Sequence, residues 1–163
     1  MHPLWARVSL PVLRAISKRV YRHISQEVCP YNRKFSKELS LAAFAARPVL
    51  DGQDARSLAT QLLSMSQAEF SGSFKGSPMK RAKRVGIKRN AAVVLGNVGT
   101  ASDVGTLEAA LSDEEPLVRS HAAWALARLG AAASAAALES RLSVESDPSV
   151  VDSVRAALAR LTR

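Results

Sequence analysis

The feature that most constrains this chain is a repeat in its second half. Residues 87–99 align with residues 118–130 at an offset of 31, and both copies carry an alanine pair, a leucine and a terminal glycine at the same places. A third copy, residues 150–161, follows at an offset of 32. Self-similarity at a fixed period indicates a stack of structural repeats, each packing on its neighbours.

Residues that commonly begin and end helices flank the three copies. Asp147-Pro148 offers an N-cap followed by proline at the first helical position, and Glu115-Pro116 repeats this arrangement one unit earlier. Gly99 and Gly130 stand where helix-ending glycines are common, so both are predicted to close their helices. Each repeat is therefore expected to contain a helix pair.

The core of the stack is predicted from helical spacing in the second copy. Apolar residues there recur at three- and four-residue steps and form one stripe: Val118, Ala122, Ala125, Leu126 and Leu129. Small residues at one repeat position, Gly96, Ala127 and Ala159, would allow helices to approach closely. Hydrophobic residues make up 47% of the chain and aromatic residues only 5%, which suits packed helices better than a sheet. The predicted fold class is all-α, a short α-solenoid of HEAT-like repeats over residues 86–163.

Upstream of residue 86 the pattern is less regular. Asp54 to Met65 is predicted to be one helix, and Ser66 is predicted to cap another. Residues 25–85 are interpreted as an irregular helical lead-in, and residues 1–24 as an unrelated or disordered extension. A single cysteine, Cys29, excludes an internal disulfide, and the expected location is cytoplasmic with no membrane association.

Charge supplies the functional signal. The formal net charge is +9, and residues 70–102 contain seven basic residues and no acid. Lysine and arginine neutralise phosphates whatever the nucleotide sequence, so this run predicts contact with an RNA backbone. On a helix, Arg81, Arg84 and Lys88 would share a face. The predicted RNA-binding residues are Lys75, Lys80, Arg81, Lys83, Arg84, Lys88, Arg89 and Asn90.

Several motifs carry a resemblance to a known family. Residues 25–33 (SQEVCPYNR), 74–84 (FKGSPMKRAKR), 89–97 (RNAAVVLGN) and 117–126 (LVRSHAAWAL) follow one another in the family's order. Together they resemble the C-terminal region of epoxyqueuosine reductase. The resemblance implies HEAT-like repeats, a role in queuosine biosynthesis, which is a tRNA modification, and contact with tRNA through phosphates.

The same resemblance implies cofactors that this chain does not hold by itself. The family uses cobalamin and two 4Fe-4S clusters, and its cluster motif places cysteines where this sequence has Arg22 and Ser25, leaving Cys29 as a remnant ligand position. A cluster needs about four thiolates. We therefore expect no cofactor, no metal site and no catalytic residue in this chain, which is interpreted as a truncated member and no enzyme on its own.

Other interpretations remain open at this stage. The basic run would also suit a scaffold that binds an acidic protein partner, and a non-functional gene remnant is a third alternative. His121 has no second histidine or cysteine at metal-binding spacing. Trp124, three residues on, is expected to pack between repeats more than to stack on a nucleobase.

Overall fold

The computed structural model describes residues 30–35, 47–130 and 132–162 of the chain. Contacts divide the chain into two compact units, residues 1–45 and 46–163. The described part of the first unit is α2 (Pro30–Phe35), which opens on a proline. The predicted extension 1–24, with Arg22, Ser25 and Cys29, lies outside the described residues.

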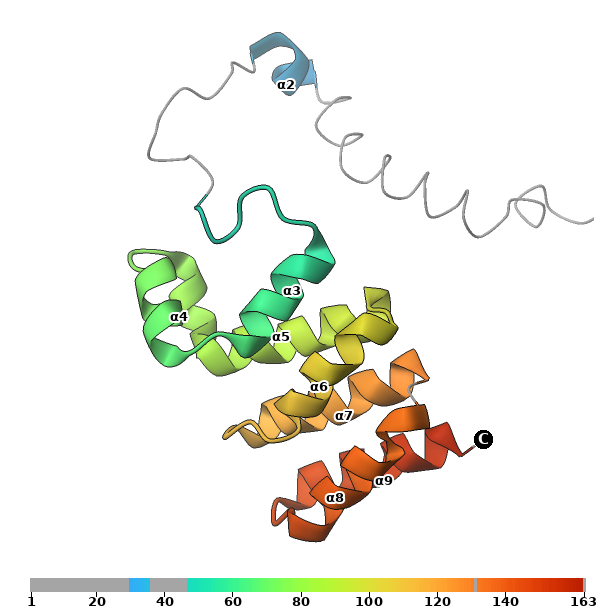
Figure 1. Cartoon of the computed structure of the whole chain (residues 1–163). Coiled ribbons are helices and arrows are strands. Elements are labelled where there is room, and N and C mark those ends of the chain that lie inside the picture. The colour runs from blue at the N-terminus through green and yellow to red at the C-terminus, as the bar shows by residue number, and fades with distance from the viewer. Residues whose placement is uncertain (1–29, 36–46, 131, 163) are drawn as a thin grey trace, which may run out of the picture. The chain divides into compact units, whose positions relative to one another are not determined.

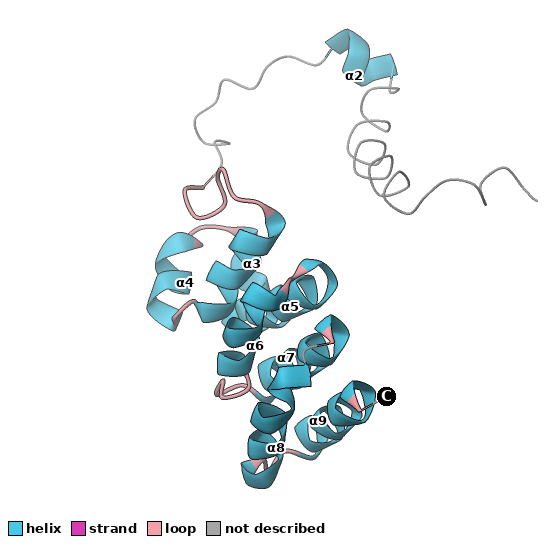
Figure 2. Ribbon diagram, turned by 45° about the vertical axis from the view of Figure 1, so that its right-hand side comes forward, coloured by secondary structure: helices cyan, strands magenta, loops and turns pink. Residues whose placement is uncertain are grey.

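The second unit is a helical stack, as the repeat predicts (Figures 1 and 2). No strand occurs among its described residues, so the all-α prediction is confirmed. Its elements in chain order are α3 (Ala55–Ser64), α4 (Gln67–Ser73), η3 (Pro78–Ala82), α5 (Lys83–Val98), η4 (Ala101–Asp103), α6 (Val104–Ala110), α7 (Pro116–Leu129), η5 (Ala132–Ser134), α8 (Ala135–Val144) and α9 (Pro148–Leu161).

One layer of the stack is a row of helices from alternate positions in the chain. Helix α3 packs on α5, α5 on α7, and α7 on α9, while α6 and α8 pair with α7 and α9 as a second layer (Figure 2). The helical stack thus begins at α3, upstream of residue 86, which lies inside α5. Helix α3 contributes Ala59 and Leu63 to the same hydrophobic core as the repeats.

The predicted core face of α7 is confirmed. Leu126 is completely buried, as are Val118, Ala122 and Ala125, and Leu129 packs against them while half-buried. Close approach of α5 and α7 depends on glycine: a Cβ atom on Gly96 would lie 3.1 Å from the Cα of Ala125. Small residues therefore allow neighbouring repeats to pack closely, as the sequence indicates.

The helix ends agree with the sequence, although the two helix-ending glycines adopt different conformations. Asp54 and Ser66 cap α3 and α4 through side-chain oxygens, and Asp147 does the same for α9. Gly130 ends α7 in the left-handed conformation with φ 69°. Gly99 closes α5 as predicted, but with φ −68° and ψ 170°, which is extended backbone. A Cβ atom at Gly99 would collide with the carbonyl oxygen of Leu95, so lack of space explains this glycine.

Candidate nucleic-acid interface

The basic run folds around a cleft formed by α4, η3 and the start of α5. The cleft has a volume of about 310 Å³ and is lined by Gln67, Phe70, Ser71, Lys80, Lys83 and Arg84. Lys80 and Lys83 are exposed to solvent. We call this site the basic cleft. Of the predicted RNA-binding residues, it brings together Lys80, Lys83 and Arg84.

The floor of the basic cleft belongs to a small hydrophobic cluster. Phe70 and Phe74 are buried, their ring centroids lie 5.3 Å apart, and they pack with Met65 and Ile87. Because Phe70 and Phe74 belong to α4 and its C-terminus while Ile87 belongs to α5, this cluster fixes the two sides of the cleft against each other. The two sides of the basic cleft are therefore held in place by packed helices.

The chain turns sharply where it enters α5. Ser77 caps η3 by accepting a hydrogen bond from the amide of Met79, and Pro78 is the first residue of that short helix. Lys83 then has φ 55° and ψ 168°, and it is the non-glycine residue with positive φ in the described part of the chain. Left-handed φ is rare for a residue with a Cβ and is costly to hold. The turn sets Lys80 before the bend and Lys83 at the bend, on the rim of one cleft.

Arg84 is held in place from two sides. Its Nε donates a hydrogen bond to the Gln67 side-chain oxygen at 3.2 Å, and its guanidinium forms an ion pair with Glu114. Its side chain is 14% exposed. A guanidinium has five N–H donors, and these two partners fix its orientation without using all of them. Arg84 therefore presents an oriented fork to the cleft.

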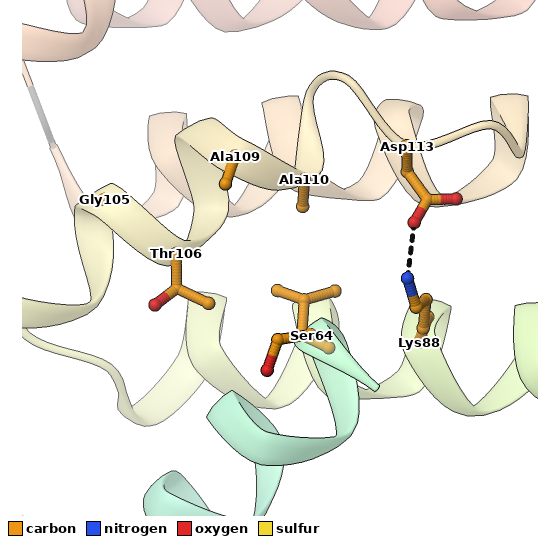
Figure 3. A pocket seen from close by; sticks show the side chains of 8 residues that line it. Ser64, Lys88, Gly105, Thr106, Ala109, Ala110 and Asp113 are labelled. Carbon is orange, nitrogen blue, oxygen red and sulfur yellow. Dashed lines mark hydrogen bonds and ion pairs between the residues drawn. The ribbon is translucent and has the colours of Figure 1, made fainter. Parts of the chain in front are cut away.

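Lys88 has a different environment from the rest of the run. Its Nζ lies 2.7 Å from the Asp113 carboxylate, and the two side chains are only 10% and 8% exposed (Figure 3). The basic run contains no acid in sequence, but folding brings Asp113 and Glu114 from the next repeat onto Lys88 and Arg84. The face expected for Arg81, Arg84 and Lys88 on one helix does not form, because Arg81 lies in η3 and only the other two lie in α5. Lys88 joins two repeats instead of facing solvent.

The remaining predicted residues occupy three places. Lys75 and Arg81 are exposed in the segment before α5. Asn90 is exposed on α5, two turns beyond Lys83. Arg89 is half-buried, and its Nε has no hydrogen-bond partner among the described residues. None of these four side chains lines the basic cleft.

The Lys88 contact recurs one repeat later with other residues. Arg119 aligns with Lys88, and it binds Glu145 through Nε and a second guanidinium nitrogen, each at 2.8 Å. Arg141 adds a third contact to the fully buried Glu145 carboxylate. The Arg119 hydrogen bond lowers the pKa of Glu145 from 4.5 to about 2, despite the opposing effect of burial. A cation on α5 and a cation on α7 thus each pair with an acid of the following repeat.

The described residues do not fit a metal centre. No group of three or more His, Cys, Asp or Glu side chains among them could hold a metal ion. The whole sequence has one cysteine, whereas an iron–sulfur cluster takes about four thiolates. His121 hydrogen-bonds through Nδ1 to the carbonyl oxygen of Leu117, a contact within its own helix. These residues cannot supply the ligand set of a 4Fe-4S cluster.

Trp124 meets its sequence-based expectation in part. One edge of its ring lies over Gly96, which is the packing between repeats that the sequence predicts. The residue remains 39% exposed. It therefore belongs both to the α5–α7 contact and to the molecular surface.

Sequence reasoning missed two kinds of residue. Gln67 and Ser71 line the basic cleft although neither belongs to the basic run, and no local signal marks them. Asp113 and Glu145 were not paired with their cations, although the repeat carries the signal. Each acid stands three residues before the proline that opens the next helix, at the same offset of 32 as Pro116 and Pro148.

In the described residues, every helix is too short or too polar to span a lipid bilayer. Stacked helix pairs, close contacts through small residues and recurring ion pairs define the class of fold, an α-solenoid with HEAT-like repeats. The family model of HEAT repeats matches residues 80–159.

The relatives of this chain are more specific than that class. It is 38% identical over 128 residues to epoxyqueuosine reductase from Alicycliphilus denitrificans, a match that covers 72% of this chain and 34% of the relative. It is 40% identical over 108 residues to epoxyqueuosine reductase from Xanthomonas campestris pv. campestris, covering 64% of this chain and 28% of the relative. The resemblance inferred from the motifs is confirmed: this chain is similar to epoxyqueuosine reductase over about two thirds of its own length.

Solved structures agree with these relatives. A crystal structure of epoxyqueuosine reductase with an epoxyqueuosine-modified tRNA-Tyr stem loop superimposes with a TM-score of 0.72 at 27% identity, covering 85% of this chain and 36% of that one. Epoxyqueuosine reductase from Bacillus subtilis gives a TM-score of 0.65 at 28% identity. The chain spans about a third of the length of the relatives and structures it matches.

Proposed function

We propose that this chain binds tRNA through the phosphate backbone at the basic cleft and catalyses no reaction by itself. The observation that carries the proposal is the convergence of Lys80, Lys83 and Arg84 on one cleft. Phosphate binding needs concentrated positive charge, and each lysine supplies it as a mobile point charge.

Arg84 and its neighbours add geometry to the charge. Guanidinium N–H groups match phosphate oxygens in pairs, and the contacts of Arg84 with Gln67 and Glu114 limit the conformations it must give up on binding. The Ser71 hydroxyl at the same cleft is a further donor for a phosphate oxygen. Since Gln67 is already bonded to Arg84 and the lysines act as point charges, the cleft should bind RNA with little sequence preference.

Similarity to a tRNA-bound protein supports the choice of tRNA. One solved relative was crystallised with a tRNA stem loop, and that chain superimposes on most of this one. From this structural similarity we infer only that the chain contacts RNA, and no other function of the relative. Epoxyqueuosine reduction would need cobalamin and iron–sulfur chemistry, for which this chain has a single cysteine. A cytoplasmic location, where tRNA is found, belongs to the same proposal.

Titration at two salt concentrations tests the proposal. If Lys80 and Lys83 each contact a phosphate while Glu114 offsets the charge of Arg84, affinity for tRNA should fall about 12-fold between about 50 and about 200 mM salt, at a slope of about −0.9 per contact. Bulk tRNAs should bind alike, because phosphates carry no sequence information. Electrophoretic mobility or fluorescence anisotropy would measure both effects.

The alternative of an acidic protein partner predicts a different outcome. Charge reversal at Lys80 and Lys83 would weaken either kind of complex, whereas unlabelled tRNA should compete only for an RNA site. Absence of tRNA binding at low salt, or binding that salt does not change, would contradict the proposal and leave the acidic partner.

A further inference from the structure

A second groove, distinct from the basic cleft, crosses the row of helices. It has a volume of about 380 Å³ and is lined by residues from α5, α7 and α9: Val93, Ser120, His121, Trp124 and Ser153. Tryptophan supplies its large flat surface, and hydroxyl and imidazole groups surround it. We call this site the Trp124 groove.

Trp124 is fixed before any ligand arrives. A Cβ atom on Gly96 would lie 2.5 Å from the ring carbon Cζ3, so the indole rests directly on the glycine backbone of α5. The rest of the residue contributes to the groove and remains 39% exposed. An aromatic surface that is already immobilised loses little conformational entropy when a flat ligand stacks on it.

Polar groups in the groove are also oriented. The Nδ1 atom of His121 lies 2.8 Å from the Leu117 carbonyl oxygen, which can only accept, so Nδ1 carries the hydrogen and Nε2 of the neutral ring is an acceptor. The Ser120 and Ser153 hydroxyl oxygens lie 2.6 Å apart and bridge α7 to α9. The hydrogens of these groups are donated within the fold, Ser153 to the Ser149 carbonyl, Ser120 to Ser153 and His121 Nδ1 to Leu117. The groove therefore offers hydrogen-bond acceptors beside an aromatic face, a combination that suits the amino and imino groups of a nucleobase.

Arg89 adds an unsatisfied cation next to this groove. It precedes Val93 by one helical turn on the same side of α5. Unlike Arg84 and Lys88, it forms no ion pair within the described residues, and its buried Nε lacks an acceptor there. Because the Nε atom is buried, a bound phosphate would contact the other N–H donors of this half-buried guanidinium, which has no competing acid within the described residues.

We propose that the Trp124 groove holds an unpaired nucleotide of the RNA, with its base stacked on Trp124 and its phosphate near Arg89. This inference rests on the proposed function, because the basic cleft supplies the main affinity. Lys83 and Val93 are about 15 Å apart along α5, a distance that a few nucleotides span. A poly-glutamate peptide would satisfy Arg89 but has no aromatic ring to stack on Trp124, so an unpaired nucleotide fits the groove better.

Intrinsic fluorescence provides a direct test. The chain has two tryptophans, so Trp5→Phe leaves Trp124 as the sole indole. We expect an RNA hairpin with an unpaired loop to quench Trp124 emission, and a fully paired duplex with the same number of nucleotides to bind without quenching. The duplex reports on the basic cleft alone, since its bases are not available for stacking.

Substitution of the tryptophan provides the second measurement. Trp124→Leu should weaken hairpin binding by about 5- to 150-fold, the range for loss of one base–aromatic stack, and leave duplex affinity and the salt slope unchanged. Trp124→Phe should keep most of the hairpin affinity and guards against misfolding of the leucine variant. Val144→Ala, at an exposed apolar residue on α8, is the matched control and should change neither affinity.

The outcomes separate this inference from the function on which it rests. Equal binding of hairpin and duplex, with no change in either on Trp124→Leu, would overturn the groove and leave the basic cleft intact. Quenching by poly-glutamate instead of RNA would make the groove a peptide site and also overturn the inference. Lack of binding by both RNAs at low salt would remove the proposed function and this inference together.

Discussion

Lys80 and Lys88 are two lysines of one basic run, eight residues apart, and their environments differ completely. Lys80 is exposed on the rim of the basic cleft, whereas Lys88 is buried in an ion pair with Asp113. The two lysines therefore have different roles. Lys80 is available to a ligand, and Lys88 holds the stack of helices together.

The comparison shows that charge density in a sequence overstates the charge that a surface presents. In a repeat protein, the next unit lies directly against the helix that carries a basic run. Its acids therefore neutralise part of the run in the folded state, here Lys88 and Arg84. Solvent exposure, more than spacing along the sequence, decides which cations meet a ligand.

The largest expected effect is on the buried side of this comparison. Lys88→Met should lower the free energy of unfolding by about 3–5 kcal/mol, because it leaves the Asp113 carboxylate buried without its cation. Chemical denaturation would measure the loss. The double variant Lys88→Met with Asp113→Leu should recover most of it, since an apolar pair carries no uncompensated charge. A single variant as stable as the parent would mean that the pair is not buried.

A similar or slightly smaller effect is expected within the core of the repeats. Leu126→Ala should cost about 2–5 kcal/mol, because the side chain is fully buried between helices. Leu117→Ala on the same helix is the matched control, since Leu117 is 45% exposed and its loss leaves no closed cavity. Equal shifts in thermal melting for the two variants would contradict the core assignment.

Acid should weaken the second ion-pair site progressively. The pKa of Glu145 is lowered from 4.5 to about 2 in the folded protein, so the unfolded chain binds protons more readily than the folded chain. The stabilisation by Arg119 is then fully present above pH 4.5 and disappears as the pH falls toward about 2. Glu145→Gln should flatten this part of the stability–pH curve. An unchanged curve in that variant would assign the acid sensitivity to other groups.

The smallest effect on stability is expected on the exposed side. Lys80→Ala should change the free energy of unfolding by no more than about 0.5 kcal/mol, because Lys80 is a surface residue with no ion pair in the described part of the chain. The same variant should reduce the salt slope of tRNA binding by about one. A large loss of stability, or an unchanged slope, would remove the distinction between the two lysines.

Most of the fold could be predicted from the sequence because the period of the repeat can be read directly from it. The core position of Leu126, the αL glycine at Gly130 and the cap at Asp147 follow from spacing and punctuation alone. The extended conformation of Gly99 could not be predicted from its position in the repeat. Its conformation depends on the η4 turn that follows, where Asp103 closes back onto the amide of Thr100.

The candidate site was less predictable because its geometry depends on contacts between distant residues. The run itself identifies the cations, but Asp113 lies 25 residues from Lys88 in sequence and reaches it only when the helices stack. Gln67 joins Arg84 across the bend between α4 and α5, which no periodicity encodes. Local patterns predicted the elements, whereas the partners of each side chain required the fold.

The conformation of Lys83 has a consequence for protein engineering. Its φ of 55° is a backbone geometry that glycine adopts freely, so Lys83→Gly should relieve strain of about 1–3 kcal/mol. The same substitution removes a cation from the cleft. A screen for thermostability alone would therefore select a glycine at this position and discard affinity for polyanions, whereas a screen for binding would retain the less stable lysine. At position 83, selection for stability and selection for binding therefore favour different residues. The order in which the two screens are applied determines which variant is kept.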